Sequence, residues 1–123
     1  MLNHAPILIA EDDPLLAFEL QVAVKDAEGE AVGPARSVVA ALEILQLIIV
    51  AGAVLEVQLP DGDVTPVAKV LIARRVPMVF QSDADLPPEL QSLCPDVPVF
   101  KRPVSARLLV ERLSELIRPQ DWE

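Results

Sequence analysis

The sequence predicts an α/β protein, a doubly wound (βα)5 arrangement around a five-stranded parallel sheet. Three observations predict this class: short apolar runs recur along the chain, helix-start signals follow most of them, and the connections between them are short. Strands that alternate with helices in this way form a parallel sheet covered on both faces. The 123 residues suffice for a single domain over residues 1–123, with an ordered core at about 5–118 and a tail at 119–123.

The apolar runs place the strands, and capping residues and prolines place the helices. We expect strands at residues 7–10, 31–33, 53–57, 78–81 and 97–101. We expect helices at residues 14 to about 29, 38 to about 48, 66 to about 75, 89–93 and 106 to about 118, with N-cap candidates Asp13, Ser37, Thr65 and Ser105. Pro98 cannot donate to a sheet ladder, so the last strand should lie at a sheet edge.

Polar residues stand where several of these strands end. Glu11 and Asp12 follow the first strand and Glu56 lies in the third, while Ser82 and the pair Lys101-Arg102 follow the fourth and fifth. In such sheets ligands bind beyond the carboxyl ends of the strands. Carboxylates at this density favour a hard cation such as Mg²⁺, and a hydroxyl and a cation opposite them suit phosphoryl oxygens. The pattern therefore indicates a phosphoryl-acceptor site rather than a hydrolase, for which no Ser-His-Asp or Cys-His set is present.

Composition excludes several other classes. The net charge of −9 opposes binding to the phosphates of nucleic acid. The most apolar stretch, residues 40–57, contains Glu43, Gln46 and Glu56, and its charge-free part is too short to span a membrane. The N-terminus carries no secretory pattern, and the single cysteine, Cys94, fits a reducing compartment. We therefore expect a cytoplasmic protein that binds neither nucleic acid nor membrane.

Four segments, in order, carry a resemblance to a known family. Residues 7–14 (ILIAEDDP) resemble its first strand and acidic pair, residues 54–62 (VLEVQLPDG) the strand with the phosphorylated aspartate and its loop, residues 79–82 (VFQS) the strand that ends in Thr or Ser, and residues 100–103 (FKRP) the segment in which lysine precedes proline. Over nearly its full length the chain resembles a bacterial response-regulator receiver domain of two-component signalling, of the single-domain kind. The resemblance implies a flavodoxin-like fold with strand order 2-1-3-4-5 and a role in phosphorelay signalling.

The resemblance also implies roles for individual residues. Glu11 and Asp12 would form the acidic pair, with Asp12 the stronger candidate for a metal ligand, and Gln58 would offer its backbone carbonyl to the metal. Ser82 would supply the hydroxyl that follows the phosphoryl group, although a serine at a strand end can also simply satisfy local backbone. The peptide bond before Pro103 would be cis, as the corresponding bond is in the family.

The departures from the family decide the functional prediction. Glu56 replaces the phosphorylated aspartate, Arg102 stands before the proline with Lys101 one step earlier, and Val99 replaces an aromatic residue. The longer Glu56 side chain occupies space meant for phosphoryl oxygens or Mg²⁺, and arginine prefers to pair with a carboxylate. We predict an ion pair between Glu56 and Arg102, with Lys101 as the alternative partner, and Mg²⁺ binding that is weak or absent.

Such a pair has three interpretations. It imitates the phosphorylated state, or it freezes an unphosphorylated shape that still binds a partner, or the site has decayed; Val99 counts against the first. We expect a stand-alone signalling module and not an enzyme. The alternative is a competent, Mg²⁺-dependent phosphoacceptor. A flavodoxin-like small-molecule binder is the remote alternative, because Glu11, Asp12 and Asp13 would repel a phosphate and no organic cofactor is indicated.

The expected partners are a histidine kinase, a phosphotransfer protein or a downstream signalling protein. A homodimer could form through the fourth helix, fifth strand and fifth helix, as the resemblance implies. It could also form through the helix at residues 38–48, in which only Glu43 and Gln46 are strongly polar. Deep burial of that helix is the other explanation of its composition.

Overall fold

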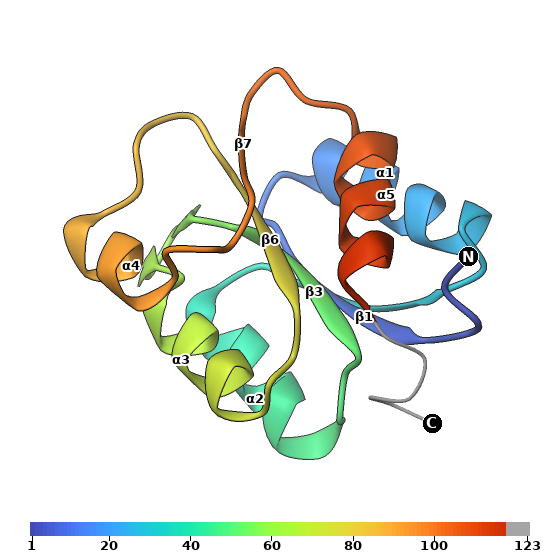
Figure 1. Ribbon diagram of the computed structural model, residues 1–123, viewed down its shortest axis with the longest axis horizontal. Helices are drawn as coiled ribbons and strands as arrows, with labels where there is room; N and C mark the ends of the chain where they lie inside the picture. Colours follow the sequence, from blue (N-terminus) through green and yellow to red (C-terminus); the bar gives the residue numbers. More distant parts are fainter. Residues whose placement is uncertain (118–123) are drawn as a thin grey trace.

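The computed structural model describes residues 1–117; the predicted tail, with Trp122, lies outside this range. Five parallel strands form one sheet in the order β2-β1-β3-β6-β7 (Figure 1). They are β1 (Pro6–Ala10), β2 (Glu30–Ala35), β3 (Gly52–Glu56), β6 (Met78–Ser82) and β7 (Val99–Lys101). Because β4 (Gln58–Leu59) and β5 (Gly62–Asp63) form a separate antiparallel hairpin, this order is the predicted 2-1-3-4-5.

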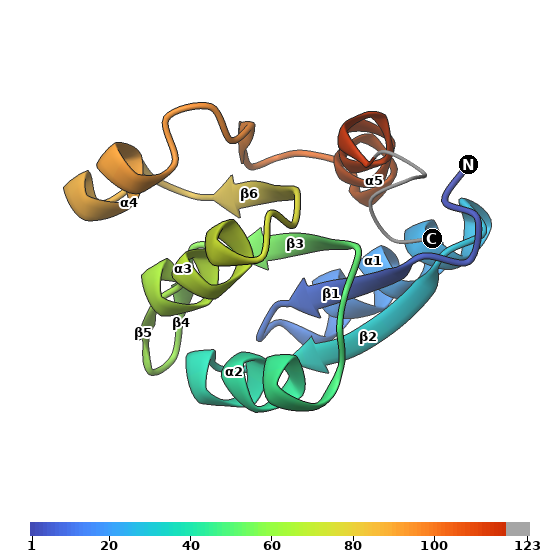
Figure 2. The same cartoon turned by 60° about the horizontal axis from the view of Figure 1, so that its bottom comes forward.

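Helices cover both faces of the sheet (Figure 2). On one face, α1 (Pro14–Asp26) and α5 (Ala106–Leu116) pack on Ile7, Ile9, Val54 and Val79; we call this cluster the α1–α5 core. On the other, α2 (Val38–Leu47), α3 (Thr65–Ala73) and α4 (Pro88–Leu93) pack on Leu8, Ala10, Leu55 and Phe80. Successive strand residues thus alternate between two cores, as the two-residue period of a strand requires. The predicted doubly wound α/β class is confirmed.

The helix starts follow the predicted caps with one exception. Asp13 accepts from the N–H groups of Leu15 and Leu16, and Ser37 and Ser105 cap α2 and α5 in the same manner. Thr65 is not a cap, because it is itself the first residue of α3; its N–H donates to Asp63 Oδ1 at 2.9 Å. Val64 stands at the N-cap and makes no side-chain capping bond, so the bond from the Thr65 N–H to Asp63 replaces the cap that the Thr-Pro pair predicts.

A second carboxylate joins the hairpin to α2. Asp61 accepts from the N–H of Val38 at 2.8 Å and from that of Val39 at 3.1 Å. These two bonds lower the pKa of Asp61. These bonds hold the β4–β5 hairpin, which follows β3, against the start of α2.

β7 lies at the edge of the sheet, as Pro98 predicts. Pro98 itself precedes the strand, yet its carbonyl still accepts from the N–H of Phe80 at 2.9 Å. The strand is shorter than expected because proline has no N–H group and can only accept, not donate, a hydrogen bond in the sheet. The Arg102–Pro103 peptide is cis, as expected, and the Gly33–Pro34 peptide is cis as well.

Burial explains most of the apolar character of α2. Val38, Ala41 and Leu45 are buried, and Ile44 is half-buried against the same core. What remains outside is the end of the helix and the loop after it, where Leu47 and Ile49 are 85% and 84% exposed. Val39, at the start of the helix, is 58% exposed, so the exposed apolar side chains lie chiefly but not only at the carboxyl end of α2. Within residues 1–117 no helix has the length and apolar character needed to cross a membrane.

Candidate functional site

Strand alternation brings three buried polar residues together at the carboxyl end of the sheet. Glu11, Glu56 and Gln81 each stand two residues after a strand residue of the α1–α5 core (Ile9, Val54 and Val79). Their side chains therefore leave the same face of three neighbouring strands. Glu56 and Gln81 are direct neighbours in the β3–β6 register. All three are at least 94% buried, since their exposed fractions are 1%, 6% and 4%.

Arg102, just after β7, lies across these residues. Its Nη2 donates to Glu11 Oε1 at 3.0 Å and to Glu56 Oε1, and Gln81 Nε2 donates to the same Glu11 oxygen at 2.8 Å. We call these four residues the Arg102 cluster. The structure thus contains the predicted ion pair between Glu56 and Arg102. The pair is not bidentate, because Nη2 alone donates to both glutamates. The other terminal nitrogen, Nη1, lies 3.2 Å from Asp83 Oδ1.

The remaining carboxylate oxygens bind backbone. Glu11 Oε2 accepts from the N–H of Asp13 at 3.1 Å, and Glu56 Oε2 accepts from the N–H of Val57 at 2.9 Å. Each buried carboxylate oxygen therefore already has a donor. This satisfies the main requirement for keeping charged groups inside a protein.

One arginine does not neutralise two carboxylates. The pKa of Glu11 is raised from 4.5 to about 7, chiefly by burial and also by the nearby charge of Glu56, while the Asp13 N–H and Arg102 oppose the change. Burial also raises the pKa of Glu56, although Arg102 opposes the change. For Arg102, burial alone would lower the pKa, but its bond to Glu56 raises it overall. The arginine therefore stays charged, and both glutamates hold a proton more readily than an exposed carboxyl group does.

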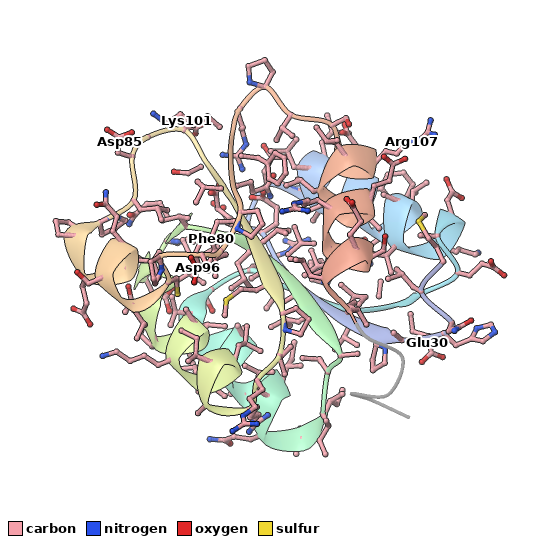
Figure 3. All side chains as sticks on the ribbon, in the orientation of Figure 1. Glu30, Phe80, Asp85, Asp96, Lys101 and Arg107 are labelled. Atoms are coloured by element: carbon pink, nitrogen blue, oxygen red, sulfur yellow. The ribbon has the colours of Figure 1, made fainter. Side chains whose placement is uncertain are left out.

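Three members of the Arg102 cluster, Glu11, Glu56 and Arg102, line a cleft of about 570 Å³. Six predicted site residues line it: Glu11, Asp12, Glu56, Gln58, Ser82 and Arg102. Lys101 is the exception. It pairs with Asp85 at 2.6 Å at the exposed outer edge of β7 (Figure 3), so it is not the cation that faces Glu56.

Ser82 is bound within its own loop. Its Oγ donates to the carbonyl of Ala84 at 2.8 Å and accepts from the N–H of Ala84 at 3.2 Å. The hydroxyl is thus used locally, which matches the simpler of the two roles that its position allows. A hydroxyl held this way must break both bonds before it can turn toward Glu56.

The cleft residues do not fit a divalent cation as they are arranged. Within residues 1–117 no three His, Cys, Asp or Glu side chains converge as metal ligands would. The Glu11 and Glu56 oxygens that face each other share the Arg102 guanidinium, which occupies the point where a cation would bind. Asp12 and Gln58 lie exposed at the rim of the cleft, and they do not supply the metal ligands that Glu11 and Glu56 lose to Arg102.

Two residues of the site were not foreseen. Gln81 supplies a donor to Glu11, and Asp83 extends the contacts of Arg102. The signal for Gln81 was available: a polar residue two positions after Val79 in a buried strand must face the same side as Glu56. Asp83 had no such signal, because it lies in a loop whose path strand periodicity does not determine.

Solved structures of other proteins resemble this fold, although no sequence-based match is found. No protein-family model matches the sequence, and no curated protein matches it. Among solved structures, SdrG from Sphingomonas melonis Fr1 is 29% identical with a TM-score of 0.75, over 95% of this chain and 100% of that chain. The non-phosphorylated HemR receiver domain from Leptospira biflexa is 21% identical with a TM-score of 0.77, over 94% and 98% of the two chains.

This chain has the receiver-domain fold of response regulators. The predicted resemblance and the flavodoxin-like fold are therefore confirmed. The response regulator PhyR from Brucella abortus also matches, at 23% identity and a TM-score of 0.74, over 92% of this chain. That match spans only 47% of PhyR, so the receiver fold is there one part of a longer protein.

Glu11 should make stability fall as pH rises through neutrality. Its pKa is raised by folding, from 4.5 to about 7, so between these values the folded chain holds a proton that the unfolded chain has released. The free energy of unfolding should therefore decrease from pH 5 to pH 8, by up to about 1.4 kcal/mol per pH unit. Urea denaturation across this range measures the slope.

Glu11→Gln should remove most of this slope, because it removes the titrating group. Glu19→Gln on the exposed face of α1 is the matched control and should leave the slope as it is. An equal slope in the native chain and in Glu11→Gln would show that Glu11 is not the group that carries the proton.

Proposed function

We propose that this protein is a receiver module of the response-regulator type that acts by binding another signalling protein, without phosphorylation of residue 56. The observation that carries this proposal is the bonding of Arg102 to both Glu56 and Glu11. By the resemblance, residue 56 stands where receiver domains carry their phosphorylated aspartate. The module is then a binding protein and not an enzyme.

The bonding of Glu56 makes it a poor phosphoacceptor. One of its oxygens accepts from Arg102 and the other from the N–H of Val57, so attack on a phosphoryl group would have to break a bond that stabilises a buried charge. In-line transfer also depends on placement, and a displacement of about 1 Å can reduce the rate on the order of 10²-fold. These considerations favour the proposal over a competent, Mg²⁺-dependent phosphoacceptor.

Among the three interpretations of the ion pair, a frozen shape is the one we propose. A module that imitates phosphorylation would use the hydroxyl at position 82 and an aromatic side chain at position 99 as its switch. Ser82 is bonded to Ala84 instead, and the residue at position 99 is a valine that is 39% exposed. Without these two parts the Arg102 cluster fixes one conformation. The acidic rim of Asp12, Asp13 and Asp83 also opposes a small phosphorylated ligand.

The surface beside the cleft offers a place for the partner. Leu15 and Phe18 on α1 are 65% and 60% exposed, and Leu108 on α5 is 46% exposed. The two helices lie side by side (Figure 1), and Asp13, which caps α1, lines the cleft. Apolar side chains next to an acidic rim suit a helical partner with an apolar stripe and basic flanks. A histidine kinase, a phosphotransfer protein or a downstream signalling protein would bind here.

Of the two expected dimer surfaces, we propose the one at the end of α2. Leu47 and Ile49 are 85% and 84% exposed there, whereas β7 exposes Val99 to only 39%. A second copy would cover the apolar side chains at the end of α2, and Arg75, at the edge of the same surface, would face the Glu43 carboxylate of the other copy.

Acetyl phosphate with Mg²⁺ should leave the intact mass of the native chain unchanged. The physical reason is that Glu56 is bonded and Arg102 fills the space for the incoming group. The double variant Glu56→Asp with Arg102→Lys, which shortens the acid and restores a point charge, should gain about 80 Da, one phosphoryl group. Mass spectrometry of both proteins is the measurement. A phosphoryl adduct on the native chain would instead support the competent phosphoacceptor.

Sedimentation velocity at two concentrations tests the dimer. We expect the native chain to dimerise as concentration rises, and the variant Leu47→Glu with Ile49→Glu to stay monomeric, because charges would replace the buried apolar contacts. Val99→Glu is the control on the other expected surface and should dimerise like the native chain. A native chain that is monomeric at both concentrations, or a dimer that Val99→Glu abolishes, would rule out this surface.

A further inference from the structure

A groove of about 1110 Å³ lies at the amino end of the sheet, away from the Arg102 cluster. Its lining comes from the start of β1, the end of α2 with the loop after it, the loop between α3 and β6, and Ile117 after α5. Pro6 begins β1, and Ala51 and Pro77 directly precede β3 and β6. The groove, which we call the amino-end groove, therefore lies across the starts of three neighbouring strands.

The amino-end groove combines apolar walls with positive charge. Leu47 and Ile49, on its α2 side, are 85% and 84% exposed, and Arg74 and Arg75 lie on its α3 side. Among residues 1–117 no aspartate or glutamate lines it, although the whole chain carries a net charge of −9. Such a lining suits an occupant that carries an apolar side chain next to acidic ones.

Arg75 stands where a helix end favours glycine. It follows the last turn of α3 with a φ of 58°, in the left-handed region, and the N–H of Val76 donates to the carbonyl of Leu71 at 2.9 Å. An arginine at a position where glycine would relieve the backbone strain indicates a use for its side chain. Arg74 is already engaged, because its Nη1 donates to the carbonyl of Leu45 at 2.8 Å. None of the ion pairs within residues 1–117 includes Arg75.

The chain itself carries a suitable occupant directly after the groove. Ile117 lines the groove and packs closely on the start of β3, since a Cβ added to Gly52 would lie 2.9 Å from its Cδ1. Residues 119–123 (PQDWE) place one tryptophan between two acidic residues and contain no basic residue. The five residues from Ile117 to Trp122 span at most about 17 Å, which suffices to reach the walls of a groove that Ile117 itself lines.

We propose that residues 118–123 dock into the amino-end groove of the same chain, with the indole of Trp122 as the anchor. The indole covers the apolar wall that Leu47 and Ile49 otherwise expose, and the acidic residues on either side of it face Arg75. Tryptophan suits this place because its ring combines a large apolar area with an attraction to guanidinium groups. Attachment to α5 gives the segment a high effective concentration at the groove.

This inference goes beyond the proposed function and meets it at one surface. The proposed dimer also covers Leu47 and Ile49 and also uses Arg75. A docked segment therefore competes with a second copy for the same side chains, and the dimer forms only as the concentration of the chain rises. The segment would in this way regulate self-association through the groove.

Fluorescence of Trp122 is a direct probe, because the chain has one tryptophan and no tyrosine. Emission of the full chain is recorded folded and in urea, at a concentration where sedimentation shows a monomer. We expect the folded chain to emit at shorter wavelength and to be less quenched by acrylamide, because docking withdraws the indole from water. Leu47→Glu and Arg75→Glu, both at exposed positions, should each remove most of this difference, with folding checked by circular dichroism.

Two further variants separate docking from a general effect of charge. Arg36→Glu makes the same charge change at an exposed position after β2, at the other end of the sheet, and should keep the native emission. Adding Asp121→Lys and Glu123→Lys to Arg75→Glu restores opposite charges across the groove and should recover the shift to shorter wavelength.

Several outcomes would overturn the inference. Emission from the folded native chain that equals that of the unfolded chain does so, and so does a shift that survives both Leu47→Glu and Arg75→Glu. A shift that Arg36→Glu also removes, or one that appears only as concentration rises, would mean that the indole does not lie in the groove of its own chain. Dimerisation and phosphorylation are read separately, by sedimentation and by mass, so failure of the proposed function is distinguishable from failure of this inference.

Discussion

The hydrogen bonds of Arg102 connect the strands at the carboxyl end of the sheet. Arg102 joins the ends of β1 and β3 through Glu11 and Glu56, although these residues lie 91 and 46 positions away from it in the chain. Buried carboxylates would otherwise be costly, and Gln81 with two backbone N–H groups supplies the remaining donors. The lining of the cleft, the raised pKa of Glu11 and the function proposed for Glu56 all depend on this arrangement.

The charged side chains and the exposed apolar side chains of this protein occupy different places. At the carboxyl end of the sheet, the buried carboxylates accept hydrogen bonds from Arg102 and from backbone N–H groups. Few of these polar groups are therefore left to bind a small ligand in the cleft. The surfaces available to partners are instead apolar: Leu15, Phe18 and Leu108 beside the cleft, and Leu47 with Ile49 at the end of α2. A receiver fold whose buried polar groups are bonded to one another can still present such surfaces, and this is the physical basis of the binding role that we propose.

Strand and helix order could be predicted from sequence because apolar runs, caps and prolines are local signals. The edge position of β7 followed from Pro98, and the pairing of Glu56 with Arg102 followed from side-chain chemistry at two strand ends. Other features depend on positions that only the folded chain brings together. The capping of α2 by Asp61, from 23 residues away, and the pairing of Lys101 with Asp85 are of this kind. Gln81 could have been foreseen from strand alternation, but the bonding of Ser82 to Ala84 depends on the path of a loop.

A double-mutant cycle between residues 56 and 102 tests the central claim most directly. The free energies of unfolding of the native chain, Glu56→Gln, Arg102→Gln and the double variant are measured at pH 8 by urea denaturation. Arg102→Gln should cost about 3–5 kcal/mol because it leaves two buried carboxylates without a counter-ion, and adding Glu56→Gln should recover at least about 1.5 kcal/mol. Single effects that add to within about 0.5 kcal/mol would show that the two side chains do not interact, and the account would be contradicted.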